Sequence, residues 1–254
     1  MDVLGSIHAF LFGKTIASAR EGNDTIAVVE RGSSRVFMCN DVVLSRLDSR
    51  LYTGGYWDYF SPLPSLYKDA RVLVIGLGGG TVPYQLESIY GSSARIDVVE
   101  ISETVSRLSK AFLPRQLRSR VIISDGTEFV KGLAPDSYDI IILDPYRTYA
   151  LARAFMEGSF IEAAYTALSQ EGILAINYII DSSNASLWEE ALSLLKGRFS
   201  MYSIAAPPAS GNRVVLCSKK LGSKEMLARI AAHFPGGAMP KHVADGYSAM
   251  EQLP

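Results

Sequence analysis

The feature that most constrains this chain is a short apolar run that leads directly into a cluster of glycines. Residues 72–75 read Val-Leu-Val-Ile, which is typical of a parallel strand buried on both faces. Residues 76–81 read Gly-Leu-Gly-Gly-Gly-Thr, and glycine permits both unusual backbone conformations and the close approach of a ligand. We expect a helix over residues 82–90, with its N-terminal N–H groups facing the same place. The segment therefore predicts a binding turn for a nucleotide cofactor.

Three kinds of cofactor compete for a glycine turn of this type. The dinucleotide fingerprint requires Gly-x-Gly-x-x-Gly/Ala; Gly76 and Gly78 fit it, but Thr81 stands at the last position. The phosphate-binding loop requires a lysine after its last glycine, and none follows here. S-adenosylmethionine has no phosphate to bind and needs no strict third glycine. The turn therefore favours S-adenosylmethionine, with a dinucleotide as the alternative.

Three later predicted strands each end in an acidic residue. Glu100 follows the glycines by about 20 residues, where a carboxylate would hold two ribose hydroxyls. Asp125, followed by Gly126, would accept a hydrogen bond from an adenine amino group, and Asp144 ends the next strand. Each acid alone could be a helix N-cap. Because ligands of open α/β sheets lie at the carboxyl ends of the strands, the ordered set predicts one cofactor site.

The alternation of strands and helices predicts the fold class. We expect an α/β protein with the Rossmann-like, seven-stranded sheet of S-adenosylmethionine transferases, mostly parallel and ending in an antiparallel pair. Residues 1–66 are predicted to form a small β-hairpin-rich domain, and residues 67–254 the cofactor-binding and catalytic domain. The predicted strands cover residues 26–30, 35–39, 42–45, 71–76, 96–100, 121–125, 139–144, 173–179, 199–205 and 213–218. The predicted helices cover residues 82–90, 102–113, 127–132, 154–168, 184–197 and 224–233.

Composition argues against several classes of partner. The formal net charge is −1, so the chain has no overall attraction to nucleic acid or to an anionic membrane. No apolar run is long enough to span a bilayer, and the N-terminus lacks a basic signal-peptide region. Cys39 and Cys217 lie in apolar runs, which predicts core residues and not a disulfide or metal site. We therefore expect a cytoplasmic protein without a metal.

The chemistry of a sulfonium cofactor assigns a role to the acid after the fourth core strand. When a carbon passes from sulfur to an amine, the protein must align the amine, exclude water and take a proton. A carboxylate can do the last of these. Pro145 favours an extended backbone at Asp144. We predict Asp144 as the positioning carboxylate or base, with Tyr146 beside it.

A dense aromatic run over residues 51–60 is the second candidate. It could close over the site, or its rings could join the two domains. The predicted acceptor pocket consists of Tyr52, Tyr56, Asp58, Tyr146 and Tyr149. The predicted cofactor-binding residues are Gly76, Leu77, Gly78, Gly79, Gly80, Glu100, Ile101, Asp125, Gly126 and Asp144.

The order of these motifs resembles the spermidine synthase family of class I S-adenosylmethionine-dependent transferases, over about residues 26–180. The resemblance implies that Glu100 holds the ribose, Asp125 and Gly126 the adenine, and that Asp144 is the catalytic acid. It also implies decarboxylated S-adenosylmethionine as an alternative cofactor, and a homodimer or homotetramer.

The sequence departs from the family pattern at four places. Gly79 stands where the first motif of the family has an Asp that helps to hold the aminopropyl amine. Arg147 replaces a second Asp of the catalytic loop, and a Gln expected near Leu44 is missing. The family's Tyr-His-Glu becomes Tyr-Thr-Gly at residues 52–54. The Gly-Leu-Gly-Gly-Gly-Thr form resembles the spermidine synthase-like branch of the family.

These departures bear on the reaction. A diamine carries two positive charges, and desolvating them without anionic partners is costly. We therefore predict methyl transfer to an amine or another nucleophile on a small molecule or protein. Aminopropyl transfer is the alternative, with Asp48, Asp58 or Glu157 replacing the lost acids. A non-catalytic cofactor-binding or scaffold role is the third possibility.

Overall fold

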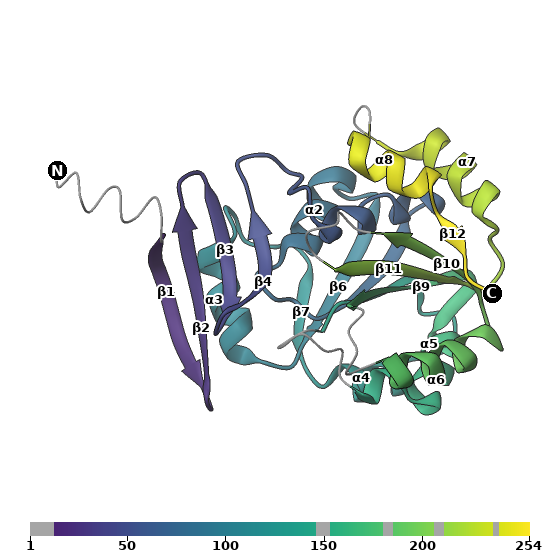
Figure 1. The fold of residues 1–254 in the computed structure, drawn as a ribbon, viewed down its shortest axis with the longest axis horizontal. Coiled ribbons are helices and arrows are strands. Elements are labelled where there is room, and N and C mark those ends of the chain that lie inside the picture. Colours follow the sequence, from purple (N-terminus) through teal and green to yellow (C-terminus); the bar gives the residue numbers. More distant parts are fainter. Residues whose placement is uncertain (1–12, 146–152, 180–184, 206–210, 236–238) are drawn as a thin grey trace.

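The computed structural model describes residues 13–145, 153–179, 185–205, 211–235 and 239–254. Within these ranges the chain forms two sheets that lie next to each other (Figure 1). The N-terminal sheet is antiparallel, with its four strands in the order β1-β2-β3-β4. Its strands are β1 (Lys14–Glu21), β2 (Asp24–Arg31), β3 (Ser34–Cys39) and β4 (Val42–Leu47).

Tight turns build this sheet from consecutive hairpins. Each hairpin has a two-residue turn, and the first turn residue has a positive φ: 62° at Gly22, 60° at Gly32 and 51° at Asn40. Such turns match the twist of paired strands, and Gly and Asn adopt the required conformation most readily. The predicted strands of this region are confirmed, and β1 is an additional strand that the sequence pattern did not predict.

The core sheet follows the predicted layout. Among the described residues it has eight strands, in the order β12-β10-β11-β9-β8-β5-β6-β7. The strands from β9 to β7 are parallel, whereas β11 is antiparallel to both β9 and β10, as predicted for the last pair. The strands are β5 (Ala70–Ile75), β6 (Ala94–Glu100), β7 (Arg120–Ile123), β8 (Tyr138–Leu143), β9 (Leu168–Ile179), β10 (Ser200–Ala205), β11 (Asn212–Ser218) and β12 (Glu251–Gln252). The mostly parallel α/β sheet is confirmed, with β12 as a short unpredicted edge strand.

Helices cover both faces of the core sheet (Figure 1). α4, α5 and α6 pack on one face, and α2, α3, α7 and α8 contribute to the cluster on the other. The α-helices are α2 (Thr81–Tyr90), α3 (Glu103–Phe112), α4 (Gly126–Lys131), α5 (Gly158–Ala167), α6 (Ala185–Lys196), α7 (Ser223–His233) and α8 (Lys241–Ser248). Short 3₁₀ helices are η1 (Tyr56–Phe60), η2 (Leu63–Leu66) and η3 (Arg153–Met156). No helix in the described part of the chain is long and apolar enough to cross a membrane.

One helical prediction needs correction, and one helix was missed. The helix predicted over residues 154–168 is split into η3 and α5, and β9 already begins at Leu168, which pairs with Tyr138 of β8. α8 was not predicted, because its apolar stripe consists mainly of Val243 and Tyr247, four residues apart. Both are buried only because η1 and β10 provide the surface that α8 covers.

The N-terminal sheet is joined to the core through the glycine turn and α3. Ser45 of β4 accepts a hydrogen bond from the Gly79 N–H at 2.8 Å, and the Thr81 hydroxyl donates to the backbone oxygen of Arg46 at 2.8 Å. Phe37 of β3 packs edge-on against Phe112 of α3, with ring centroids 5.9 Å apart. One apolar cluster runs across both sheets, so the division near residue 66 remains a proposal.

Glu87 on α2 is the centre of a buried polar cluster. Its side chain is 3% exposed, and Oε1 accepts from the N–H groups of Arg118 and Ser119 at 2.7 Å each. Arg115 Nη1 donates to Oε2 at 2.6 Å. Burial acts to raise the pKa of Glu87, but the hydrogen bonds from Arg115, Ser119 and Arg118 outweigh it and hold this pKa below its ordinary value. The ionised carboxylate therefore stabilises the fold.

We expect Glu87→Gln to lower the free energy of unfolding by about 2 kcal/mol at pH 7, because an amide N–H₂ cannot accept these bonds. The difference should shrink as the pH falls below about 4, because Glu87 of the unfolded chain is protonated there first, and it should vanish once the pH is low enough to protonate folded Glu87 as well. Urea unfolding at both pH values measures this. Glu128→Gln is the control: Glu128 is 70% exposed in its pair with Lys131, and its loss should change stability by less than about 0.5 kcal/mol. Equal effects of the two substitutions would contradict the argument.

Candidate functional site

The glycine turn after β5 has a backbone that only glycine tolerates at key positions. Gly76, Gly78 and Gly80 have φ values of +94°, +52° and +94°. A Cβ on Gly76 would also lie 2.3 Å from the backbone oxygen of Asp144, so the ends of β5 and β8 are in direct contact. Gly80 is the N-cap of α2 and provides no side-chain cap for the first turn of that helix. The turn thus leads into a helix N-terminus with backbone donors, as the sequence predicted.

Glu100 connects the glycine turn to the start of α3. It is the last residue of β6 and is buried. Its Oε2 accepts from the Leu77 N–H at 3.0 Å, and its Oε1 accepts from the Ser102 N–H at 2.8 Å. The next residue, Ile101, is 60% exposed, although it is a large apolar side chain. A carboxylate and an open apolar surface therefore lie side by side at the end of β6.

Asp125 caps the helix that follows β7. Its Oδ1 accepts from the Thr127 hydroxyl at 2.6 Å and from the N–H groups of Thr127 and Glu128 at 2.7 and 3.1 Å. The Thr127 hydroxyl is the main reason that the pKa of Asp125 lies below its ordinary value. Asp125 therefore acts as the N-cap of α4, a role that the sequence had left open. A Cβ on the next residue, Gly126, would lie 2.6 Å from Ile75 Cγ2, so that position has no room for a side chain.

Asp144 follows β8 and is held by two side chains from other elements. Asn177 Nδ2 of β9 donates to Oδ1 at 2.7 Å, and the Tyr56 hydroxyl lies 3.1 Å from Oδ1 and 3.2 Å from Oδ2. Burial raises the pKa of Asp144 to about 7, while the bonds from Asn177 and Tyr56 act to lower it. A carboxyl group with this pKa can exchange a proton near neutral pH, which is what a general base requires.

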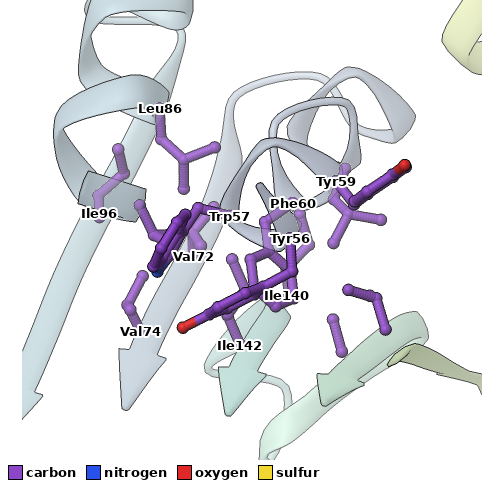
Figure 2. Packing of buried hydrophobic residues seen from close by; sticks show 14 of the residues in the cluster. Tyr56, Trp57, Tyr59, Phe60, Val72, Val74, Leu86, Ile96, Ile140 and Ile142 are labelled. Carbon is purple, nitrogen blue, oxygen red and sulfur yellow. The ribbon is translucent and has the colours of Figure 1, made fainter. Parts of the chain in front are cut away.

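The Tyr56 ring is fixed by its aromatic neighbours. Figure 2 shows Tyr56 and Trp57 beside the core residues Val74 of β5 and Ile142 of β8. The Tyr56 and Trp57 ring centroids are 4.4 Å apart, and Phe60 meets Tyr56 edge-on at 6.5 Å. Trp57 Nε1 is buried and has no hydrogen-bond partner among the described residues. A buried donor without a partner is uncommon and is a place where a ligand atom could bind.

Sequence reasoning missed the asparagines behind the carboxylate. Asn177 holds Asp144, and Asn212 Nδ2 of β11 donates to Asn177 Oδ1 at 2.7 Å. The available signal was an amide side chain in the otherwise apolar run of residues 173–179. Such a residue in a buried strand needs a polar partner.

The structure gives the described acceptor-pocket residues different contacts. It brings Tyr56 to Asp144, whereas Tyr52, the tyrosine matched to the family's Tyr-His-Glu, lies near Ser61 and Asp58. Asp58 is buried, and its hydrogen bonds go to its own loop, α2 and α8. Tyr146 and Tyr149 lie outside the described residues, as does Arg147. In the described ranges, no group of three His, Cys, Asp or Glu side chains is placed to hold a metal.

Comparison with known sequences gives a family match. Residues 60–219 match the Spermine/spermidine synthase domain. A polyamine aminopropyltransferase of Vibrio vulnificus (strain CMCP6) is 32% identical over 162 residues, which cover 62% of this chain and 51% of that protein. Putrescine N-methyltransferase 2 of Nicotiana attenuata is 33% identical over 119 residues, which cover 44% of this chain and 32% of that protein. The matches thus span about half or less of the length of these relatives.

Solved structures share the fold. Spermidine synthase from Thermotoga maritima has a TM-score of 0.72 at 18% identity, covering 95% of this chain and 85% of that chain. A spermidine synthase in complex with the transition state analogue AdoDATO has a TM-score of 0.74 at 19% identity, with coverages of 95% and 86%. The predicted Rossmann-like transferase fold with an N-terminal β sheet is therefore confirmed.

Proposed function

This chain belongs to the spermine/spermidine synthase family, and on that premise we propose that it is a group transferase using an S-adenosylmethionine-type cofactor. The observation that carries the proposal is the Asp144 carboxyl group. Its pKa is near 7, Tyr56 and Asn177 hold it, and its backbone touches Gly76 of the cofactor turn. The transferred carbon and the base would thus meet where β5 and β8 end.

The residues at the strand ends fit such a cofactor. We assign Glu100 to the ribose hydroxyls and Ile101, with its exposed apolar surface, to one face of the adenine. Asp125 would accept from the adenine amino group while its Oδ1 caps α4. The glycine turn and the backbone donors at the start of α2 would hold the rest of the cofactor, beyond its ribose and adenine. The unpaired Trp57 N–H is a further donor for this ligand.

In the proposed reaction, the side chains at this site remove a proton from the acceptor amine. When bound, the cofactor would supply an electrophilic carbon on a positively charged sulfur, and this sulfur would leave as a neutral thioether as the C–S bond breaks. Asp144 holds the amine nucleophile as its ammonium form, then takes the proton so that the nitrogen lone pair can attack. Tyr56 and Asn177 fix the orientation of the carboxylate through its oxygens.

We favour methyl transfer over aminopropyl transfer. A Cβ on Gly79 would lie 2.7 Å from the Phe112 ring and 2.9 Å from Phe37 Cβ, so an acid at this position would have to displace buried core residues before it could hold a cofactor amine. Asp58, one possible replacement, is already committed to other partners. The acceptor we propose is a small-molecule amine. Aminopropyl transfer is the second candidate because of the similarity to polyamine aminopropyltransferases. The expected homo-oligomer and cytoplasmic location stay predictions.

Calorimetric titration with S-adenosylmethionine and with its decarboxylated form tests the proposal. Tighter binding of the carboxylated form, with label transfer from its methyl group to a small-molecule amine that carries a single positive charge, is the expected result. Glu100→Ala is the control and should weaken either cofactor, because it removes the ribose contact. Tighter binding of the decarboxylated form would favour aminopropyl transfer. Binding of neither would leave only a scaffold role.

A further inference from the structure

The carboxylate of Asp58 organises the loop that leads to Tyr56. Asp58 lies in η1, two residues after Tyr56, and its side chain is 0% exposed. Thr53 N–H donates to both oxygens at 3.1 Å, and Gly54 N–H donates to Oδ2 at 2.7 Å. The Thr53 hydroxyl adds a bond to Oδ1 at 3.2 Å. These bonds close the turn at residues 53–55 against the first turn of η1.

Two partners distant in the sequence complete the surroundings of this carboxylate. Gln85 Nε2 of α2 donates to Oδ1 at 2.6 Å, and His242 Nε2 of α8 lies 2.9 Å from Oδ2. The Tyr59 hydroxyl donates to the backbone oxygen of His242 at 3.3 Å, and the two rings meet edge-on at 6.0 Å. One buried carboxylate therefore joins η1, α2 and the C-terminal helix α8.

We propose that Asp58 and His242 are positioning residues that set where the Tyr56 hydroxyl meets Asp144. Tyr56 is the first residue of η1 and directly follows the turn that Asp58 closes. Glycines at positions 54 and 55 give this turn little stiffness of its own, and Gly54 has a φ of +74°. The bonds to Asp58 supply the stiffness.

Small movements of this turn would matter for the candidate base. The Tyr56–Asp144 bond is already 3.1 Å long, and hydrogen bonds weaken steeply as distance and angle depart from their optimum. A displacement of Tyr56 of about 1 Å would therefore remove one of the two donors of Asp144. The ionisable groups facing Asp58 are His242, Tyr52 and Tyr59. His242 is 32% exposed, so solvent reaches this network from the α8 side.

The experiment follows the ionisation of Asp144 without any cofactor. Protein labelled with ¹³C at aspartate carboxyl groups is titrated by NMR, and Asp144→Asn identifies the resonance. In His242→Ala we expect the midpoint of Asp144 to rise by about half a pH unit or more, because the Tyr56 donor is lost. His242→Gln should restore the wild-type midpoint, since its amide nitrogen can donate where Nε2 does. Lys241→Ala, a neighbour on α8 that is 86% exposed, should leave it unchanged.

If His242 only stabilises the fold, the His242 variants should behave differently in this titration. His242→Ala would then unfold at lower urea concentration while Asp144 titrates as in the wild type, and that result would overturn the proposal. If His242→Ala does not fold, Gln85→Met loosens Asp58 from the opposite side and the same titration is read on it. Because no cofactor is added, failure here is distinct from failure of the proposed transferase function.

Discussion

Asp144→Asn is expected to lower turnover by about 10³-fold and to leave cofactor affinity nearly unchanged. The amide has the shape of the carboxyl group, and its oxygen can still accept from Asn177 and Tyr56. It cannot take a proton from an ammonium acceptor. Single-turnover transfer and calorimetric titration of the cofactor separate the two effects. Equal turnover in both proteins would show that Asp144 is not the base.

The pH dependence follows from the raised pKa of the same group. Asp144 must be ionised to act as a base, so turnover should rise with pH with a midpoint near 7. The folded protein binds the proton of the Asp144 carboxyl group more tightly than the unfolded chain does. The resulting stabilisation of the fold is therefore complete below about pH 4. It is lost as the pH rises to about 7, where the folded-state group ionises.

The free energy of unfolding of Asp144→Asn, relative to that of the wild type, should therefore increase by about 2–3 kcal/mol between pH 4 and pH 8. The reason is that the amide never places a charge in this partly buried position. Urea unfolding at pH 4 and at pH 8 measures the change. A constant difference between the two proteins at these pH values would show that Asp144 ionises normally in the fold.

Gly79→Asp is expected to lower the free energy of unfolding by about 3 kcal/mol, through overpacking and through burial of a charge. The substitution restores the acid of the family's first motif. Its Cβ would nevertheless meet the Phe112 ring at 2.7 Å and Phe37 Cβ at 2.9 Å, both fully buried. The N-terminal sheet and α3 would have to move apart. Thermal or urea unfolding detects the loss.

Gly222→Asp is a matched control for the introduced acid. Gly222 is the N-cap of α7, nothing lies within 4 Å of a Cβ built there, and an aspartate would cap the helix. This variant should be as stable as the wild type or slightly more stable. If Gly79→Asp folded normally and gained affinity for decarboxylated S-adenosylmethionine, the packing argument would be wrong and aminopropyl transfer would become the better proposal.

Local patterns in the sequence were enough to predict most of the fold. The buried run before Gly76, the strands that end in Glu100 and Asp144, and the short link before β11 each have a local physical cause. These causes are apolar strand composition, turn chemistry and connection length. β1 was missed because none of its residues is buried, so its sequence lacks a clear apolar face. α8 was missed because its residues become buried only against partners far away in the chain.

The candidate site divides in the same way. Asp144 could be predicted because it follows a strand, whereas the partners that hold it come from η1 and β9. Tyr52 and Tyr56 have equally good local patterns, and the tertiary structure is what places the Tyr56 hydroxyl against Asp144. His242 had no local signal at all, because its partner is 184 positions away.

The amino-acid sequence alone thus determined where the glycine turn lies and which acids follow the core strands, since both depend on a few consecutive residues. The tertiary structure decided the raised pKa of Asp144, the lack of free space for a side chain at position 79, and the contact of Tyr56 with Asp144. Burial, steric contact and hydrogen bonding between distant segments are properties of the packed chain. They exist only when β3, α3, β9 and η1 meet around the glycine turn.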